Sequence, residues 1–229
     1  MRKAWLAFVI AGLMAAWSAP ASAVVLYDNG GPDYNTGYFS DTVNASGNYY
    51  VAYNQFSLAT GATITGIEWW GFYFPGNTPP PTDPFDYYIT ANPGGGGPPG
   101  AVLDSGVLGS GSPVDTGSQS FPFGSFDVYE YNASTSIPLG AGTYYLSIYE
   151  TDPTSDGSAF TWATSTETAV GTEEWSISPV NGEAGAAEIG LAFNLTGGGG
   201  ATVPEPATMT LLGLGLTGLV AKLSRRKSR

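Results

Sequence analysis

The side chains available for chemistry between residues 24 and 203 are almost all carboxylates, hydroxyls and aromatic rings. This region has no His, Cys, Lys or Arg, and it holds every acidic residue of the chain except Glu205. A Ser-His-Asp triad, a cysteine nucleophile and a Schiff base are therefore excluded, and zinc lacks its usual nitrogen and sulfur ligands. A carboxylate pair, as in glycoside hydrolysis, remains. Glu173 and Glu174 are adjacent and would point to opposite faces of a strand, so we predict that the protein is not an enzyme.

Two loops rich in oxygen ligands could bind calcium. Residues 150–157 place Asp152 and Asp156 in one turn after an expected strand, and residues 28–33 have a similar composition. Calcium prefers carboxylate and carbonyl oxygens, although neither loop has EF-hand spacing. Asp, Asn and Gly are also ordinary turn residues. Asp152 and Asp156 are therefore the predicted calcium ligands, no other cofactor is expected, and the turn interpretation stands beside the calcium one.

The densest aromatic cluster is the segment 69–74. In a strand, alternation places Trp70, Phe72 and Phe74 on one face and Trp69 and Tyr73 on the other. One face should pack in the core, and the other could stack on sugar rings or cover a second layer. The candidate carbohydrate contacts are Trp69, Trp70 and Tyr73, and core packing is the alternative.

A segment near the C-terminus combines three features in a fixed order. Pro204, Glu205 and Pro206 come first, and the two prolines hold Glu205 in an extended backbone with few donors. Residues 207–221 are uncharged and predict a transmembrane helix, although at ~1.5 Å per residue they span only ~22 Å of the ~30 Å hydrocarbon core. A basic tail follows and favours a cytoplasmic end by the positive-inside bias.

This combination resembles the PEP-CTERM sorting signal of Gram-negative bacteria, also called the ice-binding protein C-terminal domain. The resemblance covers residues 203–229 and implies that an exosortase-type membrane protease recognises and processes the segment at Pro204, Glu205 and Pro206. It also implies a precursor in the inner membrane and a product in the cell envelope or extracellular matrix. An ordinary C-terminal membrane anchor is the alternative, since it needs only the apolar segment and the basic tail.

The N-terminus has the pattern of a secretory signal peptide. Two basic residues precede an apolar stretch, and Ala21 and Ala23 form a small-x-small cleavage site before Val24. We therefore predict that residues 1–23 are a signal peptide and that the exported protein begins at Val24.

Between the two terminal signals the sequence predicts one all-β domain, a jelly-roll-like antiparallel β-sandwich. Short aromatic and β-branched segments alternate with turn-forming clusters, and no helical period is present. The domain is expected over residues 24–196, with a Gly-rich linker over 197–202 before the sorting signal at 203–229. Segments 63–71 and 141–148 are similar to secreted jelly-roll domains, some of which bind carbohydrate. The expected strands are residues 24–27, 49–58, 63–74, 86–91, 101–108, 126–131, 143–149, 160–163 and 188–194.

The acidic composition and the two terminal signals together predict the function. Residues 24–203 contain 18 of the 19 acidic residues and none of the seven Lys and Arg, a formal charge of −18. Such a surface repels nucleic acid and anionic membranes. We expect a secreted acidic protein, sorted by an exosortase-type system to the cell envelope or exopolysaccharide matrix, with a structural or adhesive role. A calcium-dependent carbohydrate-binding module is the alternative, and a carboxylate-only glycosidase is a third interpretation.

The expected partners follow from these signals. They are the exosortase-type protease, extracellular polysaccharide, and the membrane, which the C-terminal helix enters before processing. No nucleic acid is expected, because the domain has no basic side chain to bind phosphate.

Overall fold

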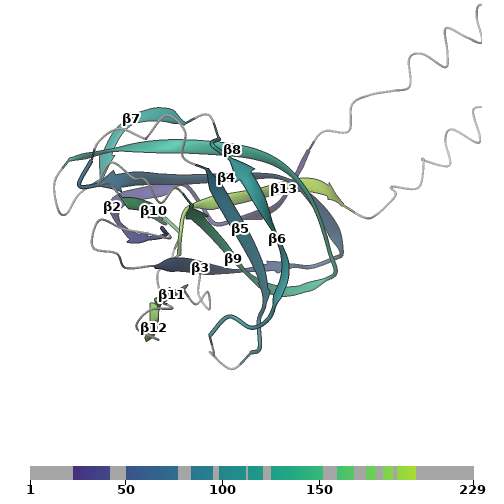
Figure 1. Ribbon diagram of the computed structural model, residues 1–229. Helices are drawn as coiled ribbons and strands as arrows, with labels where there is room; N and C mark the ends of the chain where they lie inside the picture. Colours follow the sequence, from purple (N-terminus) through teal and green to yellow (C-terminus); the bar gives the residue numbers. More distant parts are fainter. Residues whose placement is uncertain are drawn as a thin grey trace, which may run out of the picture.

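A computed structural model of the chain shows an all-β protein (Figure 1). It describes residues 23–41, 50–76, 84–94, 98–111, 113–120, 125–151, 159–167, 174–178, 183–187 and 190–199. Within these ranges the regular secondary structure consists of strands, and none of it is a helix long and apolar enough to cross a membrane. The predicted signal peptide, apart from its last residue Ala23, and the predicted helix at 207–221 lie outside the described residues. The strands are β1 (Val24–Asp28), β2 (Pro32–Phe39), β3 (Val51–Leu58), β4 (Ala62–Phe74), β5 (Phe85–Ala91), β6 (Val102–Gly109), β7 (Val114–Ser120), β8 (Phe126–Leu139), β9 (Gly142–Glu150), β10 (Ala159–Ser165), β11 (Glu174–Ser178), β12 (Glu183–Ala187) and β13 (Phe193–Gly199).

The strands form two antiparallel sheets. In sheet A the path runs β1-β13-β4-β10-β2, with β8 paired to β4 and β7 paired to β8. In sheet B the order is β12-β11-β3-β9-β5-β6. One hydrophobic core takes side chains from both sheets, including Ile64 and Trp69 of β4 and Leu146 and Ile148 of β9. The two sheets therefore pack against each other, which agrees with the all-β antiparallel class that the sequence predicts.

Strand β4 organises sheet A. One edge of β4 pairs with β8 from Ala62 to Gly71. The other edge is divided between two strands, because β13 pairs with the first part of β4, up to Trp69, and β10 pairs with the last part, from Gly71 to Phe74. β1 extends the sheet beyond β13, and β2 extends it beyond β10. The two halves of β4 thus carry different neighbours.

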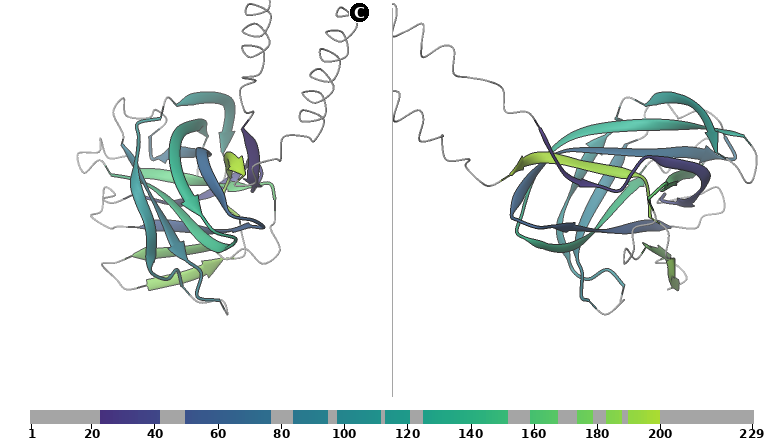
Figure 2. Two further views of the ribbon diagram at one scale, coloured as in Figure 1. Left: turned by 90° about the vertical axis from the view of Figure 1, so that its right-hand side faces the viewer. Right: turned by 180° about the vertical axis from the view of Figure 1, so that it is seen from behind.

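Strands β1 and β13 bring two distant parts of the chain to one end of the molecule. Val24 pairs with Gly197, and Gly199 pairs with Ala62 at the start of β4. Phe74 lies at the other end of β4, which has 13 residues, and at ~3.3 Å per residue the two ends lie about 40 Å apart. Figures 1 and 2 show β1 in purple and β13 in yellow side by side, away from the ends where β2 and β10 meet β4.

The C-terminal boundary of the domain differs from the prediction. The expected strand at 188–194 is observed as Phe193–Gly199, and Gly197, Gly198 and Gly199 pair with β4. A linker over 197–202 is therefore wrong for its first three residues. Gly197 is needed for close strand approach, because a Cβ on it would lie 2.1 Å from the Thr63 carbonyl oxygen.

Candidate functional site

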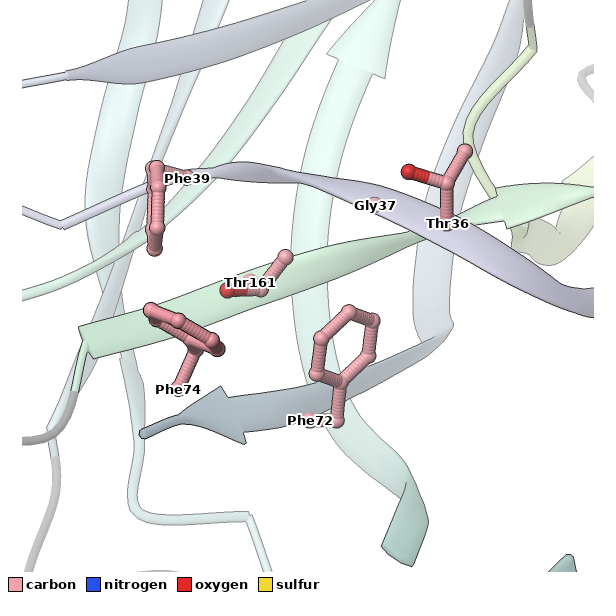
Figure 3. Close-up of a pocket in the computed structure, with 6 residues that line it drawn as sticks. All are labelled: Thr36, Gly37, Phe39, Phe72, Phe74 and Thr161. Atoms are coloured by element: carbon pink, nitrogen blue, oxygen red, sulfur yellow. The ribbon is translucent and has the colours of Figure 1, made fainter. Parts of the chain in front are cut away.

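An aromatic pocket lies on the face of sheet A that points away from the main core (Figure 3). Alternation along β4 produces this arrangement, because Trp69 and Tyr73 belong to the main core, whereas Trp70 and Phe72 point to the opposite face. The pocket has a volume of about 260 Å³. It is lined by Thr36, Gly37 and Phe39 of β2, Thr161 of β10, and Phe72 and Phe74 of β4.

Strand register places the lining residues together. Thr161 pairs with Phe39 on one side and with Phe72 on the other, so the three residues form a row across β2, β10 and β4. Residues that are directly opposite in neighbouring strands share a face of the sheet. Figure 3 shows Thr161 between the rings of Phe39 and Phe74 and the ring of Phe72. The pocket is therefore built on paired strands and not on a loop.

Aromatic contacts hold the rings in place. Phe72 stacks on Phe126 of β8 with ring centroids 5.9 Å apart, and Phe74 meets Phe126 edge-on at 5.4 Å. Phe74 also meets Phe39 edge-on at 6.1 Å. Gly37 leaves room for this packing, because a Cβ there would lie 2.9 Å from Cε1 of Phe72. Rings fixed in this way need little reordering when a ligand binds.

The chemistry of the pocket is apolar and neutral. Among the described residues that line it, none has an ionisable side chain, and the hydroxyl groups of Thr36 and Thr161 are the polar side-chain groups. Phe39 is 37% exposed and forms an open wall, whereas Phe72 is buried. A charged group would lose its hydration here without gaining a partner. The pocket can therefore bind the apolar face of a neutral ring or an apolar side chain.

A second feature of sheet A is a polar row near the β1–β13 edge. Asp28, Asn194, Glu68 and Asn132 are in register across β1, β13, β4 and β8. The amide of Asn194 donates to Oε2 of Glu68 at 2.8 Å, and the amide of Asn132 donates to Oε1 of Glu130 at 3.0 Å. Glu68 and Asn132 also line an open pocket of about 370 Å³.

The environment of Glu68 changes its affinity for protons. Burial is the largest cause that raises the pKa of Glu68, and the nearby carboxyls of Glu130 and Asp28 raise it further. The hydrogen bond from Asn194 acts in the opposite direction. A side-chain hydrogen bond with Glu130 is a further cause that raises the pKa of Glu68. The two residues form a carboxyl pair that sequence reasoning did not identify, because it depends on the pairing of β4 with β8.

The predicted carbohydrate contacts are not on the surface. Trp69 and Tyr73 have no exposed area, and Trp69 stacks on Tyr131 with centroids 5.3 Å apart. Trp70 is 8% exposed and packs in a second small cluster with Phe72. Their assignment as sugar contacts does not fit this burial, whereas the alternative of core packing does. The pocket instead uses Phe72 and Phe74, which the alternation pattern placed on the face opposite to Trp69 and Tyr73, and Phe39, which lies on a strand that was not predicted.

The calcium and cleavage predictions are only partly covered by the described residues. Asp152 and Asp156 lie outside them, as do Ala21, Pro204, Glu205 and Pro206. Ala23 is exposed and directly precedes β1, which begins at the predicted first residue of the mature protein, Val24.

The residues from the end of β1 to the start of β2 show ordinary turn chemistry. The amide of Gly30 donates to Asp28 Oδ1 at 2.8 Å, and the amide of Asn35 donates to Asp33 Oδ1 at 2.9 Å. Among the described residues no three acidic side chains come together as metal ligands.

Comparison with known proteins identifies the C-terminal segment. The family model of the PEP-CTERM protein-sorting motif matches residues 202–227, whereas no curated protein and no solved structure matches the chain. The matched segment contains Pro204, Glu205 and Pro206 and begins three residues after the last residue of β13. Such a motif implies export, targeting to the cell envelope and recognition by exosortase, a membrane protein. The chain therefore carries a PEP-CTERM protein-sorting motif directly after its all-β domain.

Proposed function

We propose that this protein is a non-catalytic adhesive component of the cell envelope or exopolysaccharide matrix, where exosortase-dependent sorting delivers it. In this proposal the sandwich domain binds an extracellular polymer and the C-terminal motif determines where the domain is placed. The precursor is held in the inner membrane by residues 207–221 until the motif is processed. The domain itself carries no catalytic centre.

The observation that carries the proposal is the position of the aromatic pocket relative to the sorting motif. β13 ends at Gly199 and the motif begins at residue 202, so the connection spans about 11 Å at most. The end of the sandwich with Ala62 and Gly199 therefore stays close to the site of attachment. Phe72 and Phe74 are at the other end of β4, about 35–40 Å away. A domain held at its C-terminal end presents this pocket to the surroundings.

The arrangement of the acidic pair supports a non-catalytic role. Glu68 and Glu130 share a hydrogen bond, whereas a glycosidase needs its two carboxyl groups about 5 Å or more apart, on either side of the scissile bond. The pair is better suited to stabilising neighbouring strands through Asn194 and Asn132.

The alternative function, a carbohydrate-binding module, is also compatible with this pocket. The sugar would then contact Phe39 and Phe74, and not the buried tryptophans. The apolar walls and two threonine hydroxyls suit the face of a neutral sugar, and the charge of −18 over residues 24–203 disfavours an anionic polymer. A calcium requirement at Asp152 and Asp156 stays a prediction.

The test measures binding of the purified exported protein to neutral polysaccharides and to the matrix of the producing cells. Phe39→Ala and Phe74→Ala should each weaken binding at least tenfold, because they remove the walls of the pocket. Val25→Ala, which changes an apolar residue that is 59% exposed on β1, near the opposite end of sheet A, should not. Thermal unfolding of each variant checks that the domain remains folded.

Three results would contradict the proposal or modify it. Equal binding by wild type, Phe39→Ala and Phe74→Ala would show that the pocket has no part in adhesion. Loss of binding in EDTA, restored by calcium, would favour the calcium-dependent alternative. Release of reducing sugar from any polysaccharide would show that the domain is an enzyme.

A further inference from the structure

Strand β6 is the last strand of sheet B, and it carries apolar side chains that lie in solvent. Val102, Leu103 and Val107 are 54%, 53% and 72% exposed. In the part of the chain that the structure describes, β6 pairs only with β5 (Figure 1). Its outer edge therefore presents backbone N–H and C=O groups beside exposed apolar side chains. Edges of this kind readily pair with another strand.

The edge has only some of the features that prevent such pairing, namely one acid and a register slip near each end, one of them at Leu103. Lys, Pro and bulges commonly protect edge strands, but β6 contains neither Lys nor Pro, and Asp104 is its one charged residue. The register between β5 and β6 slips by one residue near each end of the strand, and residues 104–107 between the two slips pair regularly. The regular part of the edge is therefore only four residues long, and we expect a partner strand to bind it weakly and reversibly.

The sequence of β6 is self-complementary about Ser105. In an antiparallel pair of two copies centred on Ser105, each Leu103 faces Val107 of the other copy, and each Asp104 faces Gly106. Directly opposite residues share a face and have Cβ atoms ~4.5–5.5 Å apart. Two apolar pairs therefore form, and the acid meets a residue without a side chain. A register shifted by one residue towards Gly106 would instead place Asp104 against Val107.

Charge favours this edge over the rest of the surface for self-association. Residues 24–203 have a formal charge of −18 and no basic residue, so most contacts between two copies bring carboxylates together. The β6 edge combines three exposed apolar residues with one acid. Centring on Ser105 keeps the two Asp104 carboxylates from facing each other.

We propose that two copies of this protein associate through an antiparallel β6–β6 pair centred on Ser105. The pairing joins the two copies of sheet B into one continuous sheet across a two-fold axis. Because the regular ladder is short, the dimer forms in a concentration-dependent way. This inference is independent of the polymer-binding pocket, which lies on sheet A.

Cysteine cross-linking tests the centre of the pair. The chain has no Cys, so Ser105→Cys introduces a single thiol. Across the two-fold axis the two Cα atoms would lie ~4.5–5.5 Å apart, within the range that a disulfide spans. Under mild oxidation Ser105→Cys should form a disulfide-linked dimer at least tenfold faster than the control Ser136→Cys, which places a thiol on the exposed face of β8. Equal rates for the two variants would overturn the proposal.

A charge exchange tests the register in solution. Leu103→Lys alone and Val107→Asp alone should each reduce the dimer fraction in sedimentation experiments on the full chain, because each places a charge opposite an apolar residue. The variant with both substitutions should associate more strongly than either single variant, since the new lysine of each copy then faces the new aspartate of the other. A wild-type protein that stays monomeric at high concentration would overturn the proposal. So would a dimer that none of these substitutions affects.

Discussion

At the scale of single residues, Gly37 determines whether the aromatic pocket can exist. A Cβ at this position would lie 2.5 Å from the carbonyl oxygen of Trp162 and 2.9 Å from Cε1 of Phe72. Backbone and ring would both have to shift. The close approach of β2 to β10 and β4 therefore depends on a residue without a side chain.

We expect Gly37→Ala to destabilise the domain by about 1–3 kcal/mol, the range for overpacking of a tightly packed site. It should also weaken ligand binding, because the ring of Phe72 is displaced. Chemical denaturation measures the effect. Gly31→Ala is the matched control, since a Cβ there would meet no atom within 4 Å. If the two substitutions cost the same, the close packing at Gly37 would be disproved.

Glu68 provides a residue-scale prediction about pH. Its pKa is raised in the folded protein, chiefly by burial, so the folded state binds the Glu68 proton more tightly than the unfolded state. This contribution to stability is present below the unfolded pKa and is lost as the pH rises through the folded pKa. At neutral pH the ionised group therefore disfavours folding relative to an uncharged side chain.

Glu68→Gln should make the domain more stable at pH 7, by less than about 1 kcal/mol because the group is partly exposed to solvent. The gain should shrink as the pH falls towards 4. Urea unfolding at several pH values measures this, with Asp127→Asn as a control of equal charge change at an exposed site. A gain at pH 7 that persists unchanged at pH 4 would contradict the assigned environment of Glu68.

At the scale of elements, the sequence predicted a strand correctly where apolar and aromatic residues alternate clearly. The segments around Trp69 and Leu146 combine aromatic and β-branched residues with clear alternation, and both are long central strands, β4 and β9. β2 begins at Pro32 and contains Tyr34 with a positive φ of 59°, a conformation that is rare for a residue other than glycine. Its strand character comes from pairing with β10 and not from local preference.

Strands β7 and β12 were missed for a related reason. β7 has the sequence VDTGSQS, with Gly117 at a positive φ, and β12 has the sequence EAGAA. Gly, Ala, Asp and Ser have low strand propensity, so only the pairing partners β8 and β11 define these elements. The aromatic pocket was missed in part because it needs β2. The acidic pair was missed because cross-strand register cannot be deduced from one strand.

The glycines of β13 allow a test at the element scale. A Cβ on Gly197 would lie 2.1 Å from the Thr63 carbonyl oxygen, whereas a Cβ on Gly198 would meet nothing within 4 Å. We therefore expect Gly197→Ala to lower the melting temperature by several degrees and Gly198→Ala to leave it within about one degree. A flexible linker would tolerate both changes. If neither substitution changed the melting temperature, residues 197–199 would behave as a linker and not as part of β13.

At the scale of the whole molecule, like charges oppose folding. Residues 24–203 carry 18 acidic side chains, and the same region has no Lys, Arg or His to neutralise them. Between 10 mM and 1 M sodium chloride the melting temperature should rise, because the Debye length falls from ~30 Å to ~3 Å and repulsion is screened. A melting temperature that is independent of salt would show that this repulsion is negligible. A rise with millimolar calcium alone, reduced by Asp152→Asn, would point to a specific site.

The central claim is that the segment after β13 is a sorting signal, read through Glu205, and not a passive anchor. The sequence predicts that Pro204 and Pro206 make the backbone around Glu205 extended and poor in donors, which would suit recognition by a processing enzyme. Glu205→Ala leaves the apolar segment and basic tail intact. An ordinary anchor should behave as before, and Thr208→Ala, in the same segment, serves as the control.

The most direct measurement compares the size and location of the protein in cells that carry Glu205→Ala and in cells that lack the exosortase. In both we expect unprocessed precursor, with residues 225–229 still attached, to accumulate in the inner membrane, whereas Thr208→Ala should be processed normally. Wild-type size and location in both the Glu205→Ala cells and the exosortase-deficient cells would contradict the account.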